Sequence, residues 1–314
     1  KISINGSQKL FKEAAMYAYE SFSPDGKYIM INTIEKPFSY LVTVNRFPQK
    51  TTIYDANGTS VRLVNEVPLD EIRPKGFMAT RKGKRNMGWR DDLPASLSYV
   101  VPLDEGDPSI EVPFRDEVFS WDAPFLSEPK AILKTKQRFS GITWGTKDLA
   151  IAYDSWYDTR NTKTYLFNPS NALAEPKIIT DRNSQDVYSD PGNFETTRNE
   201  FNQSVLLQDT GSLYLIGEGH TKNGQFPFID EFNIRTLKTK RLYQSSYNDK
   251  IEDILSIEDI KKGDNYRKEI VKFCFNKKQL TAWELKYILC DCFLDDNCYN
   301  GNIMGKIFKK DFDI

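Results

Sequence analysis

The sequence predicts an all-β fold, a β-propeller built from four-stranded antiparallel blades, and three observations lead to this class. Aromatic residues are frequent at 13%, and Tyr and Phe, which dominate them, favour strands. Short apolar segments alternate with turns rich in Gly, Pro, Asp and Asn. The strands also recur in groups of four, at a period of roughly 45 to 65 residues, which is typical of propeller blades. Sandwiches and barrels contain many short strands as well, but nothing obliges them to repeat in fours.

Each unit begins with a pair of strands around a polar turn that contains Asp. In the first unit, Ser-Pro-Asp-Gly precedes the alternating strand "KYIMINTI". The turn recurs in altered form as Arg-Asp-Asp-Leu-Pro, Gly-Thr-Lys-Asp and Gln-Asp-Thr-Gly. The four pairs are "SFSPDGKYIMINTI" (21–34), "MGWRDDLPASLSYVV" (87–101), "GITWGTKDLAIAYD" (141–154) and "QSVLLQDTGSLYLIGE" (203–218).

Each unit ends with a second hairpin whose last strand carries basic residues. The first of these hairpins holds Asn57-Gly58, a strong hairpin signal because both residues tolerate positive φ. The four segments are "TIYDANGTSVRLV" (52–64), "VFSWDAPFLSEPKAIL" (118–133), "TYLFNPSNALAEPKII" (164–179) and "FIDEFNIRTLKTKRLY" (228–243). We therefore expect units near 15–65, 86–135, 139–180 and 200–245, and a fifth that begins near "IEDILSIEDI" (251–260).

Four to five blades suggest an incomplete propeller, assigned to residues 1–275, followed by an atypical tail at 276–314. The tail lacks the four-strand pattern, and Thr281-Ala-Trp-Glu284 within it matches a helix capping box. All four cysteines, Cys274, Cys290, Cys292 and Cys298, lie in the last 41 residues. This change of character suggests a frameshift or an unnatural junction near Asn276.

Composition excludes several partner classes. The net charge of −1 gives no general attraction to nucleic acid, and no apolar stretch is long enough to cross a bilayer. We therefore expect no nucleic-acid and no membrane partner. The basic segment 73–90 has seven Lys or Arg and no acid, but Asp91 and Asp92 follow at once, so a solvated connection between blades is the better interpretation.

The residues offer little catalytic chemistry. No Gly-x-Ser-x-Gly elbow is present, and the single histidine, His220, lies in a glycine-flanked loop that favours a solvated turn. The cysteine spacing does not match a zinc ribbon or finger, and the acidic loop 181–193 lacks the pattern of an EF-hand. We expect no metal site and no cofactor. A glycosidase or lyase site using Asp154, Asp158 or Asp186 has no supporting spacing.

Several longer segments resemble the propeller of the prolyl oligopeptidase family of serine peptidases, in its glutamyl endopeptidase-like branch. They are "PFSYLVTVNRFPQKTTIYDANG" (37–58), "GFMATRKGKRNMGWRDDLPASLSYVVPLDEGDP" (76–108), "QRFSGITWG" (137–145), "DRNSQDVYSDPGNFETTRN" (181–199) and "LYLIGEGHTKNGQFPFID" (213–230). The resemblance implies a propeller that gates and selects peptide substrates for an α/β-hydrolase domain with a Ser-Asp-His triad. That domain is missing from these residues, so no catalytic residue is carried over and the chain alone is expected to be inactive.

The resemblance also implies a preference for acidic peptides, for which arginines are natural partners. Candidates that line the substrate path are Arg46, Arg90 and Arg160, although ordinary ion pairs remain the alternative for each. The expected partners are a peptide substrate and the missing hydrolase domain, and open blade edges favour self-association. The rival interpretation is a stand-alone propeller that binds another protein. The compartment is not indicated, although a periplasmic or extracellular parent protein is slightly favoured.

Overall fold

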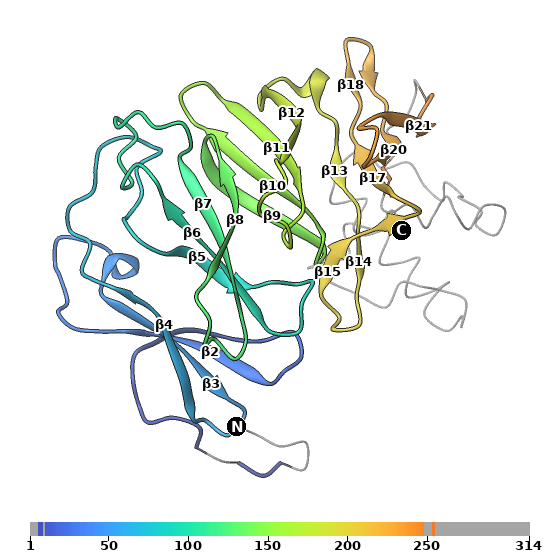
Figure 1. Ribbon diagram of the computed structural model, residues 1–314. Helices are drawn as coiled ribbons and strands as arrows, with labels where there is room; N and C mark the ends of the chain where they lie inside the picture. The colour runs from blue at the N-terminus through green and yellow to red at the C-terminus, as the bar shows by residue number, and fades with distance from the viewer. Residues whose placement is uncertain (1–5, 9, 248–252, 255–314) are drawn as a thin grey trace, which may run out of the picture. The chain divides into compact units, whose positions relative to one another are not determined.

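Four antiparallel sheets succeed one another along the chain in the computed structural model, which describes residues 6–8, 10–247 and 253–254 (Figure 1). We call them blades 1 to 4. The predicted propeller of four-stranded blades is confirmed. Blade 1 contains β1 (Tyr17–Phe22), β2 (Tyr28–Ile34), β3 (Gln49–Asp55) and β4 (Ser60–Val67), and blade 2 contains β5 (Arg85–Trp89), β6 (Ser96–Pro102), β7 (Asp116–Asp122) and β8 (Lys130–Thr135). Blade 3 contains β9 (Arg138–Thr146), β10 (Leu149–Trp156), β11 (Asn161–Phe167) and β12 (Lys177–Asn183).

Blade 4 differs from the other three in its first strand. Its main path is β13 (Asn193–Phe194), β17 (Ser212–Gly217), β20 (Phe228–Asn233) and β21 (Thr239–Gln244), and β16 (Gln208–Asp209) pairs with the same edge of β17 as β13 does. A hairpin of β14 (Thr196–Arg198) and β15 (Ser204–Leu206) is inserted in the chain between β13 and β16. The expected pair at 203–218 is therefore only partly right, because β15 pairs with β14 and not with β17.

The predicted hairpins of the first three blades form as expected, and the turn chemistry explains why. In the β3–β4 turn, an Asp55 carboxylate oxygen accepts hydrogen bonds from the backbone N–H of Asn57 (2.9 Å) and of Thr59 (2.8 Å), while Gly58 takes a φ of 91°. In the Ser-Pro-Asp-Gly turn between β1 and β2, Asp25 accepts from the Ser23 hydroxyl at 2.7 Å. The backbone N–H of Asp25 donates to Pro94 in the β5–β6 turn, so this turn also joins blade 1 to blade 2.

Neighbouring blades pack face to face, because alternate residues of each strand point to opposite faces of the sheet. On β10, Ala150 and Ala152 pack against blade 2, whereas Leu149 and Ile151 pack against blade 4. Blades 1 and 2 share a third cluster that is rich in aromatic rings. Its buried members are Met30, Ile53, Val64, Leu97, Tyr99, Trp121 and Phe125.

The up-and-down order of strands divides the connections between two ends of the sheets. We call the end with the β2–β3, β6–β7 and β10–β11 connections, together with the links between blades, the loop face. The end with the β1–β2, β5–β6 and β9–β10 turns is the turn face. The β2–β3 connection contains the short 3-10 helix η1 (Val44–Arg46), and the link from blade 3 to blade 4 contains η2 (Val187–Ser189). Among the described residues, no helix is long and apolar enough to span a bilayer.

Several expectations fall outside the described residues. These are the boundary at residue 275, the tail 276–314 with Cys290, Cys292 and Cys298, the capping box at 281–284, and Cys274. The fifth unit expected from residue 251 is described only at Asp253 and Ile254. These expectations stay predictions.

Candidate functional site

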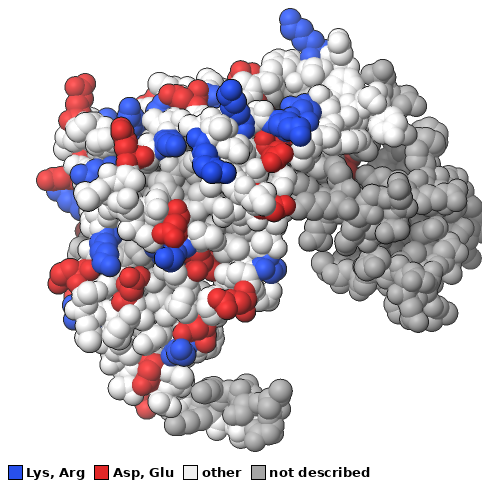
Figure 2. Space-filling view, turned by 45° about the vertical axis from the view of Figure 1, so that its right-hand side comes forward, with Lys and Arg blue, Asp and Glu red and all other residues white. Residues whose placement is uncertain are grey.

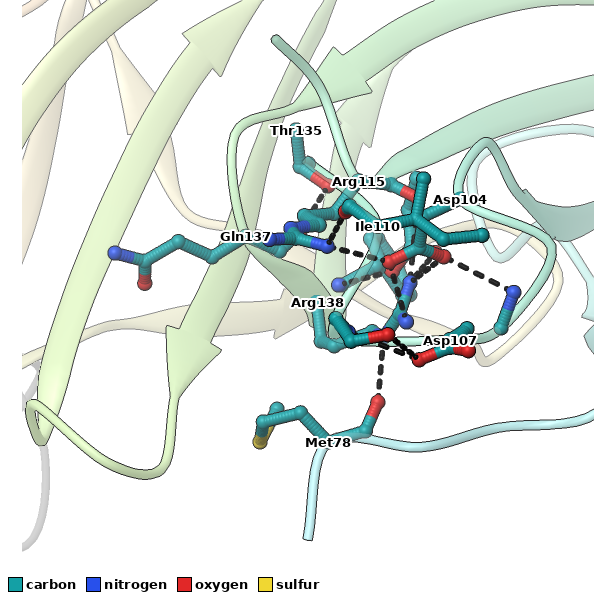
Figure 3. Close-up of polar contacts among 12 residues, drawn as sticks. Met78, Asp104, Asp107, Ile110, Arg115, Thr135, Gln137 and Arg138 are labelled. Carbon is teal, nitrogen blue, oxygen red and sulfur yellow. Dashed lines mark hydrogen bonds and ion pairs between the residues drawn. The ribbon is translucent and has the colours of Figure 1, made fainter. Parts of the chain in front are cut away.

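Five charged side chains form a buried cluster on the loop face, between blades 2 and 3. Its centre is Arg138 at the start of β9, whose two terminal nitrogens donate to the two oxygens of Asp104 at 2.8 and 2.7 Å (Figure 3). Arg115, at the end of the β6–β7 connection, donates to the same carboxylate at a distance of 2.9 Å. Such parallel N–H···O bonds fix both position and orientation of the partners.

Asp116 is the second carboxylate of this cluster and is fully buried at the start of β7. It accepts a backbone hydrogen bond from Phe139 at 2.7 Å and side-chain contacts from Arg138 (3.3 Å) and Arg85. Three guanidinium groups therefore surround two carboxylates. With every member ionised, the charge cluster carries one excess positive charge at this end of blades 2 and 3.

The charge cluster also holds the link between blades 1 and 2, residues 68–84, against the loop face. Arg138 Nε donates to the carbonyl of Met78 at 2.8 Å, as Figure 3 shows. Asp104 accepts from the backbone N–H of Gly106 at 3.0 Å, and the Gly106 carbonyl accepts from the N–H of Thr80 at 3.0 Å. These bonds position Phe77, the residue before Met78.

Phe77, Tyr157 and Arg160 form a stack of two aromatic rings and a guanidinium group next to the charge cluster. Tyr157 and Arg160 belong to the β10–β11 turn. The centroid of the Tyr157 ring is 4.2 Å from that of Phe77 and 3.7 Å from Cζ of Arg160. Two groups this close to one ring centroid must occupy its opposite faces, so Tyr157 is sandwiched between them. Phe77 is nevertheless 78% exposed. The stack adjoins the charge cluster, because Trp156, the residue before Tyr157, has its ring centroid 4.6 Å from Cζ of Arg115.

The three arginines predicted from the sequence lie in different surroundings. Arg90 lies near the turn face and is only 3% exposed. Its guanidinium donates to both oxygens of Asp92, at 3.0 and 2.7 Å, and to the Ser120 hydroxyl at 3.0 Å. Its Cζ lies 4.2 Å from the centroid of the Trp144 ring. These contacts favour the ion-pair alternative for Arg90.

Arg46, in η1 on the loop face, lies 3.7 Å from Asp70 and connects the β2–β3 connection to the start of the 68–84 link. Arg160 is on the loop face as well. Its guanidinium makes no ion pair or hydrogen bond with any residue that the structure describes, so it is the most available of the three. The structure does not bring the three arginines into one site.

The acidic candidates have local structural roles. Buried Asp154 accepts from the Tyr165 hydroxyl at 2.5 Å and from the backbone N–H of Gln137 at 2.9 Å, and burial raises its pKa above the ordinary value. Asp186 accepts from the N–H of Tyr188 at the start of η2, inside the loop expected at 181–193. Asp158 is exposed in the β10–β11 turn. In the part of the chain that is described, no three His, Cys, Asp or Glu side chains are placed to hold a metal ion.

His220 is half-buried and starts a small hairpin of β18 (His220–Thr221) and β19 (Gly224–Gln225). Its Nε2 lies 2.7 Å from the Glu218 carboxylate, beside a cavity of about 490 Å³ that Asp190 and Asn193 also line. The histidine lies in the connection between β17 and β20, but it belongs to the short strand β18 and contacts a carboxylate, so it is not the solvated turn residue that we expected.

Sequence reasoning did not find the buried charge cluster. Its members are spread over more than fifty residues, from Arg85 to Arg138, and each one looks like an ordinary surface charge. The basic segment 73–90 indeed comprises most of the connection between blades 1 and 2, together with the whole of β5. It is less solvated than expected, because Arg85 contacts Asp116 and Lys84 Nζ donates to the Val64 carbonyl at 2.9 Å.

Comparison with known proteins gives two plant relatives. The chain is 35% identical over 286 residues to a rice protein (Oryza sativa subsp. japonica) named probable glutamyl endopeptidase, chloroplastic, and 33% identical over 287 residues to an Arabidopsis thaliana protein of the same name. This chain is their homologue. The similarity covers 89% of the chain but only 30% of either relative, so the chain spans less than a third of the length of the relatives that it matches. No family model matches the chain.

Two solved structures are weakly similar. The β-propeller domain of the Trilobed protease from Pyrococcus furiosus aligns with a TM-score of 0.40 and 10% identity, over 74% of this chain and 57% of that one. The acylaminoacyl peptidase of Pyrococcus horikoshii aligns with a TM-score of 0.38 and 16% identity, over 76% and 33% of the two chains. At these TM-scores the propeller assignment depends on the chain's own four sheets.

Proposed function

We propose that the chain is the non-catalytic β-propeller part of a serine peptidase of the prolyl oligopeptidase family, and that it gates and selects peptides for an α/β-hydrolase domain. The observation that carries the proposal is the 35% identity over 286 residues to a protein named probable glutamyl endopeptidase. Identity at this level over 89% of the chain is far more specific than a shared propeller architecture.

The expected substrate is a short or unfolded peptide with an acidic residue near the cleaved bond, by analogy with the relatives' name. A rigid stack of blades restricts access to segments that are extended and narrow, whereas a folded protein is excluded by size. The loop face supplies the chemistry for selection, because arginine recognises carboxylates through its planar fork of N–H donors. Arg160 is the candidate whose fork is free of partners among the described residues.

The test is to read the encoding DNA through and beyond the codon for Asn276 in all three frames and to express the complete product. We expect a frame that continues the blade pattern and then encodes Gly-x-Ser-x-Gly. The complete product should cleave fluorogenic peptides after Glu, with peptides that carry Gln at the same position as the matched control. Closed frames together with a product that cleaves neither peptide would overturn the proposal.

The alternative, a stand-alone propeller that binds another protein, is favoured by one feature of the loop face. The β2–β3 connection exposes four large apolar side chains: Phe38, Tyr40, Leu41 and Val44. Exposed apolar residues gathered in one connection are typical of protein interfaces. The same DNA reading separates the two functions, since this alternative requires no hydrolase domain downstream.

A further inference from the structure

We propose that Phe77, Tyr157 and Arg160 form a binding site for an acidic side chain of a peptide, with Arg160 as the residue that recognises the carboxylate. This inference rests on the proposed function and specifies where on the loop face selection takes place. We call these three residues the stack site. They come from the link between blades 1 and 2 and from the β10–β11 turn of blade 3.

The guanidinium of Arg160 is held in place by stacking, while none of the described residues accepts a hydrogen bond from it. One of its faces lies on the Tyr157 ring, at 3.7 Å from Cζ to the centroid, which leaves the N–H donors along its edge open. No carboxylate, carbonyl or hydroxyl of the described residues accepts from it. The exposed acid Asp158, two residues earlier in the same turn, makes no ion pair with it in the described structure.

The backbone of the turn is fixed as well. Arg160 donates its N–H to the carbonyl of Tyr157 at 3.2 Å, and its own carbonyl accepts from the N–H of Ser184 at 2.7 Å. Its φ of 55° lies in the left-handed region, which a non-glycine residue adopts at a cost. A conformation held in this way is often a functional feature, because it presents the side chain in one orientation.

The electrostatic surroundings leave Arg160 as the group that attracts an anion at this place. The adjacent charge cluster holds three arginines against two carboxylates, Asp104 and Asp116, and both carboxylates are saturated by N–H donors. The Asp107 carboxylate also interacts with Arg115 and Arg138 and offsets the one excess positive charge of the cluster, so the charge that attracts an anion here is that of Arg160 itself. Figure 2 shows basic and acidic side chains interspersed over the face in view, without a broad basic patch on that face.

Phe77 supplies the apolar part of the stack site. Its ring packs on Tyr157 at a tilt of 31° and remains 78% exposed, so most of its surface is free for a ligand. The hydrogen bond from Arg138 to Met78 anchors the adjacent backbone. Rigid aromatic rings beside an arginine are the typical composition of a binding hot spot. The ligand that fits is a peptide with an apolar side chain next to Glu or Asp.

Binding is measured with the full 314-residue chain by fluorescence anisotropy, using a fluorescein-labelled peptide with Phe-Glu in an alanine background and the same peptide with Phe-Gln. We expect the Glu peptide to bind more tightly by about tenfold or more, since hydrogen bonds to a charged group are stronger than those to a neutral amide. Arg160→Asn, which suits a left-handed backbone, should abolish this preference, and Arg160→Lys should retain only part of it. Phe77→Ala should weaken both peptides by similar factors.

Arg235→Ala is the matched control. Arg235 is an exposed arginine in the β20–β21 turn, at the turn face, and its removal changes the net charge equally. We expect this variant to bind like the unmodified chain. Equal affinity for the two peptides, or an equal loss in the Arg160 and Arg235 variants, would overturn the stack site. Thermal melting of each variant confirms that it is folded.

The result is independent of the test of the proposed function. A complete product that cleaves Glu peptides, and does so equally well with Arg160→Asn, would uphold the peptidase and refute the stack site. Selective binding by the chain without any hydrolysis by the complete product would uphold the stack site and refute the peptidase.

Discussion

Asp116 is one of the two carboxylates that hold the buried charge cluster together. Its carboxylate is fully buried and meets Arg85, Arg138 and the backbone N–H of Phe139. We predict that Asp116→Asn lowers the free energy of unfolding by about 3 kcal/mol or more, because it leaves the largely buried Arg85 without its carboxylate partner, although Arg138 keeps its pair with Asp104. Urea denaturation followed by tryptophan fluorescence measures the loss.

The neighbouring residue offers a control for this prediction. Glu117 pairs with Lys134 at 3.6 Å near the surface of the same sheet. Glu117→Gln should cost less than about 1 kcal/mol, as exposed ion pairs do. Similar losses in the two variants would show that burial of the charge cluster contributes nothing to stability.

Asp154 gives a prediction about pH. Burial raises the pKa of its carboxyl above the ordinary value of 3.8, so the folded chain keeps this proton to a higher pH than the unfolded chain does. The free energy of unfolding should therefore fall as the pH rises from the unfolded pKa to the raised folded pKa. Asp154→Asn should remove that fall. Urea midpoints measured over a series of pH values test the slope.

Asp181, on β12 of the same blade, has a pKa shift of the opposite sign to that of Asp154. A hydrogen bond from Lys163 and another from Asn161 lower the pKa of its carboxyl. This residue stabilises the chain above the unfolded pKa, and the contribution is lost as the pH falls through the lower folded pKa. If the two Asp→Asn variants changed the pH slope in the same direction, the explanation by burial of Asp154 would be wrong.

At the scale of elements, the 68–84 link depends on its contact with the β6–β7 connection. Gly106 has a φ of 82°, and a Cβ added there would lie 2.2 Å from the backbone oxygen of Thr80. We predict that Gly106→Ala displaces the link and lowers the free energy of unfolding by about 2 kcal/mol or more, combining backbone strain with the clash. It should also weaken peptide binding at the stack site, because Phe77 belongs to this link.

Gly26→Ala separates strain from clash. Gly26 has a similar φ of 70°, but an added Cβ would meet nothing within 4 Å. Its cost should stay near the roughly 1 kcal/mol of the backbone term, and peptide affinity should not change. Equal effects of the two substitutions on stability and binding would contradict the proposed role of the link.

The elements that the sequence predicts well are those encoded locally. Asn57-Gly58 and Ser-Pro-Asp-Gly specify turns through a few neighbouring atoms, and alternation specifies the strands that flank them. The first strand of blade 4 was placed inaccurately because β13 has only two residues and lies before the β14–β15 insertion. So short a strand carries no period, and only its pairing with β17 defines it.

The candidate site was predictable only in part. Arg160 is one of the three arginines that the sequence offers as substrate-lining candidates, and Phe77 belongs to the basic segment 73–90. Their meeting at Tyr157 depends on the fold, because the link between blades 1 and 2 must reach a turn of blade 3. Arg90 illustrates the reverse problem, since its partners Ser120 and Trp144 are distant in sequence and only the fold shows that it is buried.

At the scale of the whole molecule, the described blades form a series in which each apolar cluster joins two neighbours. The first blade packs on blade 2 through Met30 and Ile53. Its opposite face carries Phe22 and Leu63, whose exposed fractions are 62% and 46%, whereas Ile29 on this face is buried and the Phe11 ring packs on Tyr54 beside it. None of the clusters among the described residues places a second sheet on this face.

We therefore predict that the chain self-associates through the outer face of blade 1, because association removes this apolar surface from water. The double variant Phe22→Ser with Leu63→Ser should shift the association to higher concentrations by about tenfold, as measured by sedimentation velocity over a concentration series. Leu173→Ser is the control, since Leu173 is an equally apolar, exposed residue in the β11–β12 connection. A monomer at every concentration, with one sharp cooperative melt, would show that this face needs no partner.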